Sequence, residues 1–251
     1  MKNTRMPSSR QEFMRHYNEV IVGKTFVEYE SYYQKSALRF WKSFDQLQRM
    51  NFPESTRVLD IGGGIMGVLL SRICGFQVTV GDVNRRAAPE IEAMGLEFIT
   101  LNLFSDHEIP EGCYDLIIFQ EVIGHIPQPA YVVFGRLVRL LASSGILFLT
   151  TPNGSRIRNV LYLLMNRQVL DHYRYPDAAE ALGMQYEYTL PQMAWQLERS
   201  GMEVMFARTY DCGWSGATLS ARLAHLATKP VGAMLPHMRS GVMAAGRRSL
   251  N

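Results

Sequence analysis

The chain has 251 residues, 47% of them hydrophobic, which is enough for one α/β domain with a small appendage and excludes global disorder. The formal net charge of +3 is too small to indicate a nucleic-acid partner, and no apolar run reaches the ~18 residues of a membrane span. Residues 1–17 contain no secretory signal, and the sequence has neither a C-x-x-C pair nor histidines at metal-ligand spacing, so we expect a cytoplasmic protein with free thiols and no metal.

Residues from about 11 to 50 are predicted to be helical, because apolar side chains recur there at helical spacing. The segment is unusually aromatic, with Tyr29, Tyr33 and Trp41 among its residues. The plainest interpretation is that these rings pack a helix against a sheet. The functional alternative is an N-terminal helical lid, residues 1–52, that covers a site in the main domain, residues 53–251.

The glycine-rich stretch at residues 57–67 organises the rest of the chain. Val58–Ile61 predicts a buried strand, and an apolar helical pattern resumes at Val68. Between them lie Gly62, Gly63 and Gly64. A strand, a glycine turn and a helix form the ligand site of many α/β sheets, because glycine lets the backbone turn tightly and approach the ligand. We therefore predict a nucleotide-like cofactor.

The acidic residues around this turn separate two classes of cofactor. Gly62, Gly64 and Gly67 fit the dinucleotide pattern G-x-G-x-x-G. Asp82 follows at the distance expected of a ribose-binding acid. Asp60, however, would repel a pyrophosphate and suits a cofactor with a cationic amino group and a sulfonium. Acid-x-Gly-x-Gly resembles the first motif of the class I S-adenosylmethionine (SAM)-dependent methyltransferases, which implies SAM as cofactor and S-adenosylhomocysteine (SAH) as its product.

Two further strands are predicted at residues 77–81 and 96–101, each followed by a polar residue. Asp82 could accept hydrogen bonds from both ribose hydroxyls, or it could cap a helix at 85–94. Asn102 stands where these methyltransferases often place an aspartate against the adenine amino group, and its side-chain carbonyl can accept the same bond. The predicted cofactor contacts here are Asp82, Val83, Asn102 and Leu103.

A fourth strand, residues 115–120, leads into segment 120–127, which has the sequence Gln-Glu-Val-Ile-Gly-His-Ile-Pro. This segment resembles the loop of small-molecule methyltransferases that act on ubiquinone precursors, sugars and natural products. The resemblance implies that Gln120 and Glu121 contact the cofactor. An oxygen acceptor that needs a general base would use His125. The alternative is that His125 only caps or packs the loop.

A helix is predicted at 132–141, a turn at Ser143–Gly145 and a fifth strand at 146–150, before the family-like Thr-Pro-Asn at 151–153. Residues 154–188 then interrupt the alternation of strands and helices. In the family, insertions at this place commonly cap the active site and choose the substrate. The predicted substrate contacts are Tyr29, Tyr33, His172, Tyr173 and Tyr175.

The core resumes with a helix at 193–200 and a strand at 202–210. The resemblance implies that residues 241–246 form the last strand, antiparallel between the fifth and the sixth. Arg247 and Arg248 would follow in solvent. Together these elements predict a Rossmann-like α/β fold with a seven-stranded, mostly parallel sheet, helices on both faces and a cap inserted after strand five.

These features predict a SAM-dependent methyltransferase that acts on a small-molecule acceptor. The resemblance favours O-methylation of a hydroxyl on a secondary metabolite, a sugar or a glycan intermediate, and the aromatic N-terminal helices could serve a homodimer. N- or C-methylation stays open, because the geometry of the cap sets the acceptor atom. Other classes are an NAD-dependent oxidoreductase, although no Tyr-x-x-x-Lys pair follows, and a non-catalytic partner that keeps the fold. Segment 120–123 lacks the Asn/Asp-Pro-Pro-aromatic signature of amino-base methyltransferases that act on nucleic acid.

Overall fold

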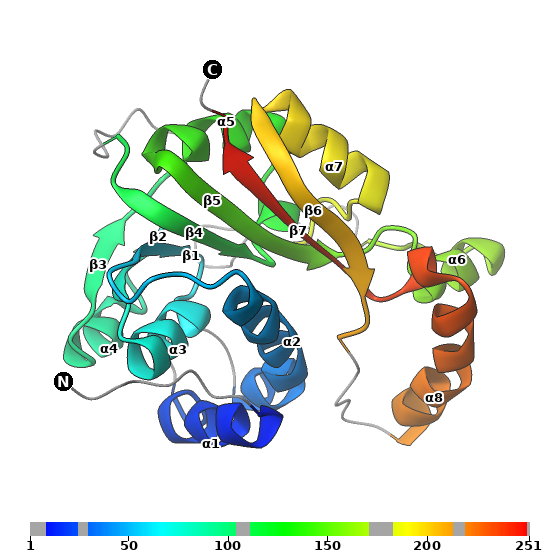
Figure 1. Ribbon diagram of the computed structural model, residues 1–251. Helices are drawn as coiled ribbons and strands as arrows, with labels where there is room; N and C mark the ends of the chain where they lie inside the picture. Colours follow the sequence, from blue (N-terminus) through cyan, green and yellow to red (C-terminus); the bar gives the residue numbers. More distant parts are fainter. Residues whose placement is uncertain (1–8, 25–29, 104–110, 171–182, 213–218, 250–251) are drawn as a thin grey trace.

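The computed structural model describes residues 9–24, 30–103, 111–170, 183–212 and 219–249. They form a seven-stranded sheet with helices on both faces (Figure 1). The strands are β1 (Arg57–Ile61), β2 (Gln77–Asp82), β3 (Glu97–Thr100), β4 (Tyr114–Gln120), β5 (Leu141–Pro152), β6 (Met202–Tyr210) and β7 (Gly241–Arg248). The helices are α1 (Arg10–Val20), α2 (Glu30–Arg49), α3 (Ile65–Cys74), α4 (Ala88–Ala93), α5 (Ala130–Leu140), α6 (Ile157–Leu164), α7 (Leu190–Arg199) and α8 (Leu219–Met234), with 3₁₀-helices η1 (Ile123–His125) and η2 (Pro236–Met238). Among these residues no helix is long and apolar enough to cross a membrane.

The strand order of the sheet is β3-β2-β1-β4-β5-β7-β6. Neighbouring strands among β1 to β5 run parallel, whereas β7 is antiparallel to both β5 and β6. The predicted Rossmann-like sheet and the predicted place of its last strand are therefore confirmed. The carboxyl ends of the parallel strands share one edge, where sheets of this kind bind their ligands.

The middle of strand β7, Ala244–Gly246, is made of small residues because it lies buried between two strands. Ala244 pairs with Leu149 of β5 and with Ala207 of β6, and it is fully buried. A Cβ on Gly246 would lie 2.8 Å from the sulfur of Met202. Close packing of β6 and α7 thus overrides the low strand propensity of alanine and glycine.

The strand also runs further than predicted, through Arg248. The guanidinium of Arg248 donates a hydrogen bond to the carbonyl of Leu141, and its side chain is half-buried. Arg247 pairs with Ile146 and is exposed. The expectation that both arginines lie in solvent is therefore wrong for Arg248, which ties β7 to the start of β5.

Both faces of the sheet are covered, as β4 shows. Leu116 and Ile118 pack in the core formed with α1, α2 and α3, whereas Ile117 and Phe119 pack in the core formed with α5 and α7. All four side chains are fully buried. Burial on both faces explains why this strand is a continuous apolar run instead of an alternating one.

Helices α1 and α2 belong to the first of these cores. The ring of Phe13 lies 5.4 Å from that of Trp41 and 5.1 Å from that of Phe44, measured between centroids. The buried hydroxyl of Tyr17 donates a 2.7 Å hydrogen bond to the carbonyl of Tyr33. The N-terminal helices therefore share a hydrophobic core with α3, and the division into lid and main domain stays a prediction.

The predicted turn at Ser143–Gly145 is wrong, because α5 leads directly into β5. Pairing between β4 and β5 jumps from Tyr114–Leu141 to Leu116–Ile146. The intervening residues form a bulged start of the strand. Serine and glycine are tolerated here because a bulge leaves residues outside the regular ladder.

Candidate functional site

The turn between β1 and α3 requires glycine. Gly62, Gly63 and Gly64 have φ angles of 85°, 102° and 77°. A Cβ on Gly62 would lie 2.3 Å from a methyl group of Val122, and one on Gly64 would lie 2.9 Å from a methyl group of Val80. Both the positive φ angles and the packing against Val122 and Val80 therefore require glycine in the turn that leads into α3.

Asp60 lies in β1 just before this turn, and its side chain is buried. Its carboxylate accepts a 2.6 Å hydrogen bond from the N–H of Gly67. Burial raises the pKa of Asp60 to about 7, while hydrogen bonds from the N–H groups of Gly67 and Met66 oppose the rise. Asp60 thus anchors the first turn of α3, and a cation placed beside it would restore its negative charge.

A small cavity of about 20 Å³ lies beside Asp60. Its walls are Tyr32, Phe40, Asp60, Gly62, Ile65, Met66 and Gln120. The amide of Gln120 donates a 2.5 Å hydrogen bond to Ser43, and its Oε1 is buried with no hydrogen-bond partner in the described part of the chain. An unpartnered acceptor beside a carboxylate fits the cationic amino group of SAM. Helix α2 covers this end of the site through Tyr32 and Phe40.

Asp82 ends β2, next to the glycine turn. Its Oδ1 accepts a 3.1 Å hydrogen bond from the N–H of Asn84. Burial raises the pKa of Asp82, and hydrogen bonds from backbone N–H groups, among them that of Gly63, lower it. The next residue, Val83, has 60% of its surface exposed. A carboxylate followed by an exposed apolar side chain fits a ribose and the face of its base.

Asn102 and Leu103 follow β3 at the same edge of the sheet. The N–H of Leu101 donates a 2.8 Å hydrogen bond to the carbonyl of Asp82, which holds the two strand ends together. Leu103 is buried, and its carbonyl accepts a hydrogen bond from Arg136. Asn102 is half-buried. The residues predicted for ribose and adenine thus come from adjacent strand ends.

Glu121 forms an ion pair that no local sequence pattern predicts. Its Oε2 lies 3.0 Å from the guanidinium of Arg39 in α2, and both side chains are largely buried. Its Oε1 accepts a 2.9 Å hydrogen bond from Thr150, and Arg39 also donates to the hydroxyl of Tyr32 at 2.7 Å. Glu121 has a φ of 60°, a backbone strain that is often found at functional sites. The pair joins α2 to the end of β4.

Replacing Arg39 by methionine is expected to destabilise the protein, because the carboxylate of Glu121 would stay buried without a cation. Breaking a buried pair on one side typically costs 3–5 kcal/mol, which corresponds to a fall of about 10 °C in melting temperature. Thermal unfolding measures it. Arg57→Met, which breaks the exposed pair with Asp115, is the matched control and should change little. Equal melting temperatures for the two variants would show that the buried pair does not fix α2.

Helix η1 carries His125 directly after β4, and the side chain is half-buried. The carbonyl of Gly124 accepts hydrogen bonds from the N–H groups of Gln185 at 2.7 Å and Tyr186 at 3.0 Å. Residues 183–188, the described end of the predicted cap, therefore pack on the short helix that holds His125. Its role as a base stays a prediction.

Of the five predicted substrate residues, the structure describes one. Tyr29, His172, Tyr173 and Tyr175 lie outside the described residues. Tyr33 is fully buried in the core formed with α1 and α2, and its contact with a substrate stays a prediction. Nowhere in the described ranges do three or more histidine, cysteine or acidic side chains group in a way that could hold a metal ion.

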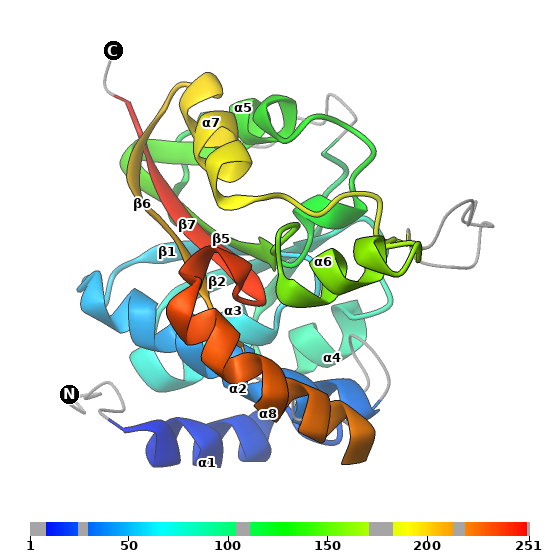
Figure 2. The ribbon, with the colours of Figure 1, turned by 90° about the vertical axis from the view of Figure 1, so that its right-hand side faces the viewer.

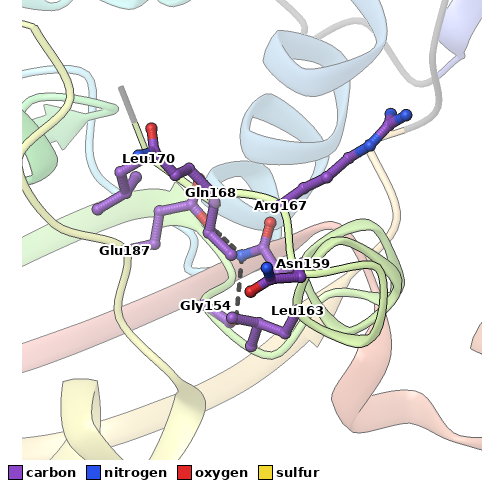
Figure 3. A pocket seen from close by; sticks show the side chains of 9 residues that line it. Gly154, Asn159, Leu163, Arg167, Gln168, Leu170 and Glu187 are labelled. Atoms are coloured by element: carbon purple, nitrogen blue, oxygen red, sulfur yellow. Dashed lines mark hydrogen bonds between the residues drawn. The ribbon is translucent and has the colours of Figure 1, made fainter. Parts of the chain in front are cut away.

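A larger cavity of about 560 Å³ lies against α6 (Figure 3). Its walls are Gly154, Asn159, Leu163, Asn166, Arg167, Gln168, Val169, Leu170 and Glu187. The amide of Asn159 donates to the carbonyl of Gly154 at 3.0 Å and to Glu187 at 2.5 Å, as Figure 3 shows. Arg156 pairs with Glu187 in the cavity wall. Gln185 and Tyr186, which precede Glu187, donate to the carbonyl of Gly124, so the cavity wall is joined to the loop that carries His125. No local sequence pattern predicts this network.

Comparison with known proteins agrees with this geometry. A SAM-dependent methyltransferase of Methanosarcina mazei is 18% identical over 82% of this chain and 98% of its own, with a TM-score of 0.56. A SAM-dependent methyltransferase of Archaeoglobus fulgidus is 12% identical over 84% and 94%, with a TM-score of 0.57. The 1,6-didemethyltoxoflavin-N1-methyltransferase of Burkholderia thailandensis, solved with SAH and 1,6-didemethyltoxoflavin, is 14% identical over 96% and 87%, with a TM-score of 0.54.

The family itself is shown by a sequence model. Comparison with curated protein sequences gave no match. A family model described as a methyltransferase domain matches residues 29–205, well over half of the chain. The match includes the glycine turn, Asp82 and the loop after β4, and it sets aside the oxidoreductase. The chain therefore belongs to the methyltransferase-domain family, and it has the fold of the SAM-dependent methyltransferases named above.

Proposed function

We propose that the protein methylates a hydroxyl group of a small molecule, such as a secondary metabolite, a sugar or a glycan intermediate. The observation that carries the proposal is the position of His125 after β4, on a helix packed by residues 183–188. The polar cavity against α6, with Asn159 and Glu187 in its wall, supports an acceptor that carries several hydroxyls. Amide and carboxylate groups are suited to donating to and accepting from such hydroxyls.

Different residues would hold different parts of the cofactor. Asp60 and the Oε1 of Gln120 would bind the amino group, the glycine turn would pass along its middle, and Asp82 would bind the ribose. The bound cofactor supplies a methyl group that is already activated as a sulfonium. The protein therefore has mainly to align the acceptor and exclude water. Helix α2 and the Arg39–Glu121 pair would close the site on one side.

His125 is proposed to act as the general base. An imidazole nitrogen would accept the proton of the acceptor hydroxyl as that oxygen attacks the methyl carbon. Removing such a base typically lowers a rate by 10²–10⁴-fold. A histidine that only packs the loop would affect stability and cofactor binding instead.

The test is methyl transfer from ¹³C-methyl SAM to a panel of sugars, phenols and other hydroxylated acceptors, with NMR detection of the new methyl group. We expect an O-methyl product, a loss of kcat of about 100-fold or more in His125→Ala, and partial rescue by added imidazole. Affinity for SAH should be unchanged in this variant. His16→Ala in α1 is the matched control. An N- or C-methyl product, or full activity of His125→Ala, would contradict the proposal.

A further inference from the structure

One side of the molecule exposes a group of large apolar side chains. They belong to α6 and the residue after it, and to α8 and the residue after it. We call them the α6–α8 face: Leu161, Leu163, Leu164, Met165, Leu226, Met234 and Leu235. Leu164 and Met234 are exposed by 78% and 81%. A concentration of exposed apolar residues on a folded protein usually marks a surface that binds something.

The two helices lie together. Helix α6 contacts α8, and Figure 2 shows both on the side of the molecule that faces the viewer there. The helices come from segments far apart in the sequence, so their shared exposure is a property of the fold. The exposed apolar residues of the α6–α8 face therefore belong to two helices that contact each other on one side of the molecule.

The segments that carry this face are basic. Residues 153–170 contain three arginines and no acidic residue, and residues 219–235 contain one arginine, one lysine and no acidic residue. The whole chain carries only +3, so the remainder is net negative. Buried Glu187 pairs with Arg156 and Arg158. Arg167, which follows α6, and Lys229 in α8 are exposed, so each of the two segments presents a cation to solvent.

We propose that the α6–α8 face docks on the surface of an anionic lipid bilayer. Apolar side chains flanked by lysine and arginine are what such a surface binds, since the former enter the headgroup boundary and the latter meet lipid phosphates. A symmetric dimer through the same face would bring its cations together, so charge favours lipid over a second copy. The large cavity beside α6 would then open next to the membrane. The proposal concerns binding only and does not depend on which atom is methylated.

The test is co-sedimentation of the full chain with vesicles of phosphatidylcholine alone and of phosphatidylcholine with phosphatidylglycerol. We expect binding to the anionic vesicles that weakens with salt. The double variant Leu164→Glu with Met234→Glu should lower binding by at least tenfold, because both side chains are exposed and would carry charge into the headgroups. Arg167→Gln with Lys229→Gln should also lower it by about tenfold or more. Trp195→Glu, at an exposed side chain of α7 outside the face, is the control and should bind as the wild type does.

Thermal unfolding of each variant separates loss of binding from loss of fold. Absence of wild-type binding to anionic vesicles would overturn the proposal. So would equal binding by all variants, because the face would then have no part in it. Light scattering tests whether a second copy of the chain occupies the face instead. A wild-type dimer that Leu164→Glu with Met234→Glu converts to a monomer would assign the face to a second copy and overturn docking on lipid.

Discussion

Asp82→Asn is expected to weaken the binding of SAM and SAH by about 100-fold. Asparagine keeps one acceptor oxygen for the N–H of Asn84, so the turn should survive, but it loses the negative charge that would accept from both ribose hydroxyls. Charge-assisted hydrogen bonds of this kind contribute about 1.5–3 kcal/mol each, and about 2.7 kcal/mol corresponds to 100-fold in affinity. Isothermal titration calorimetry with both ligands measures the change.

The same substitution at Asp45 is the matched control. Asp45 pairs on the surface with Arg49 one helical turn away, far from any strand end in sequence, and Asp45→Asn should leave the affinity unchanged. Unchanged affinity in Asp82→Asn would mean that the ribose is held by other residues. The position of the Asp82 carboxylate beside the glycine turn would then need a different explanation.

Asp60→Asn is expected to change how stability depends on pH. Burial raises the pKa of Asp60 from 3.8 to about 7, so the folded state holds a proton there that the unfolded state has lost. The resulting stability is fully present below about pH 4 and is lost as pH rises through about 7. The rise corresponds to a free energy on the order of 4 kcal/mol. Asparagine does not titrate, so the variant should lack this loss, as urea unfolding between about pH 4 and pH 8 would show.

Asp115→Asn should change the pH dependence of stability in the opposite direction, and it serves as the control. The hydrogen bond from Arg57 lowers the pKa of Asp115, so its contribution is present at neutral pH and lost as pH falls. The difference between this variant and the wild type should therefore grow toward neutral pH with the wild type more stable. If Asp60→Asn and the wild type lose stability in parallel as pH rises, the carboxylate of Asp60 is ionised throughout the range.

The same titration has a consequence for the cofactor. A cation in the cavity beside Asp60 favours the charged carboxylate, so binding of SAM should release a proton near neutral pH and tighten as pH rises through about 7. Calorimetry in buffers of different ionisation enthalpy detects the proton. Asp60→Asn should release none.

Local sequence patterns are enough to predict most strands and helices of the fold and the glycine turn at the centre of the candidate site. The apolar run of β4 and the three glycines predict a buried strand and a bare turn, because a covered sheet and a close ligand each demand one kind of residue. The antiparallel last strand could be placed only by resemblance, since its alanines are explained by neighbours distant in sequence. Asp60 was located correctly at its strand end, but its bond to Gly67 could not be foreseen from composition.

Side-chain pairs between residues that are far apart in the sequence could not be predicted from it. Arg39 and Glu121 are 82 residues apart, and neither has a local pattern that announces a partner. Asn159 and Glu187 meet only because the chain returns beside β5 after the insertion. The helical spacing of Tyr33 is the same for a core residue and for a ligand contact, and its full burial in the core could not be foreseen from that spacing.

The place of β7 bears on how the chain can fold as it is synthesised. Strands β5 and β6 do not pair with each other, because β7, made last, lies between them. While the ribosome is adding residues 211–240, both strands have an unpaired edge, and the apolar residues of β5 are available to other chains. The final strand therefore completes the sheet late, by contacts of large sequence separation, a step that is slow in general. A chain interrupted after α8 should be recovered as aggregate, although every residue of the cofactor site is already present in it.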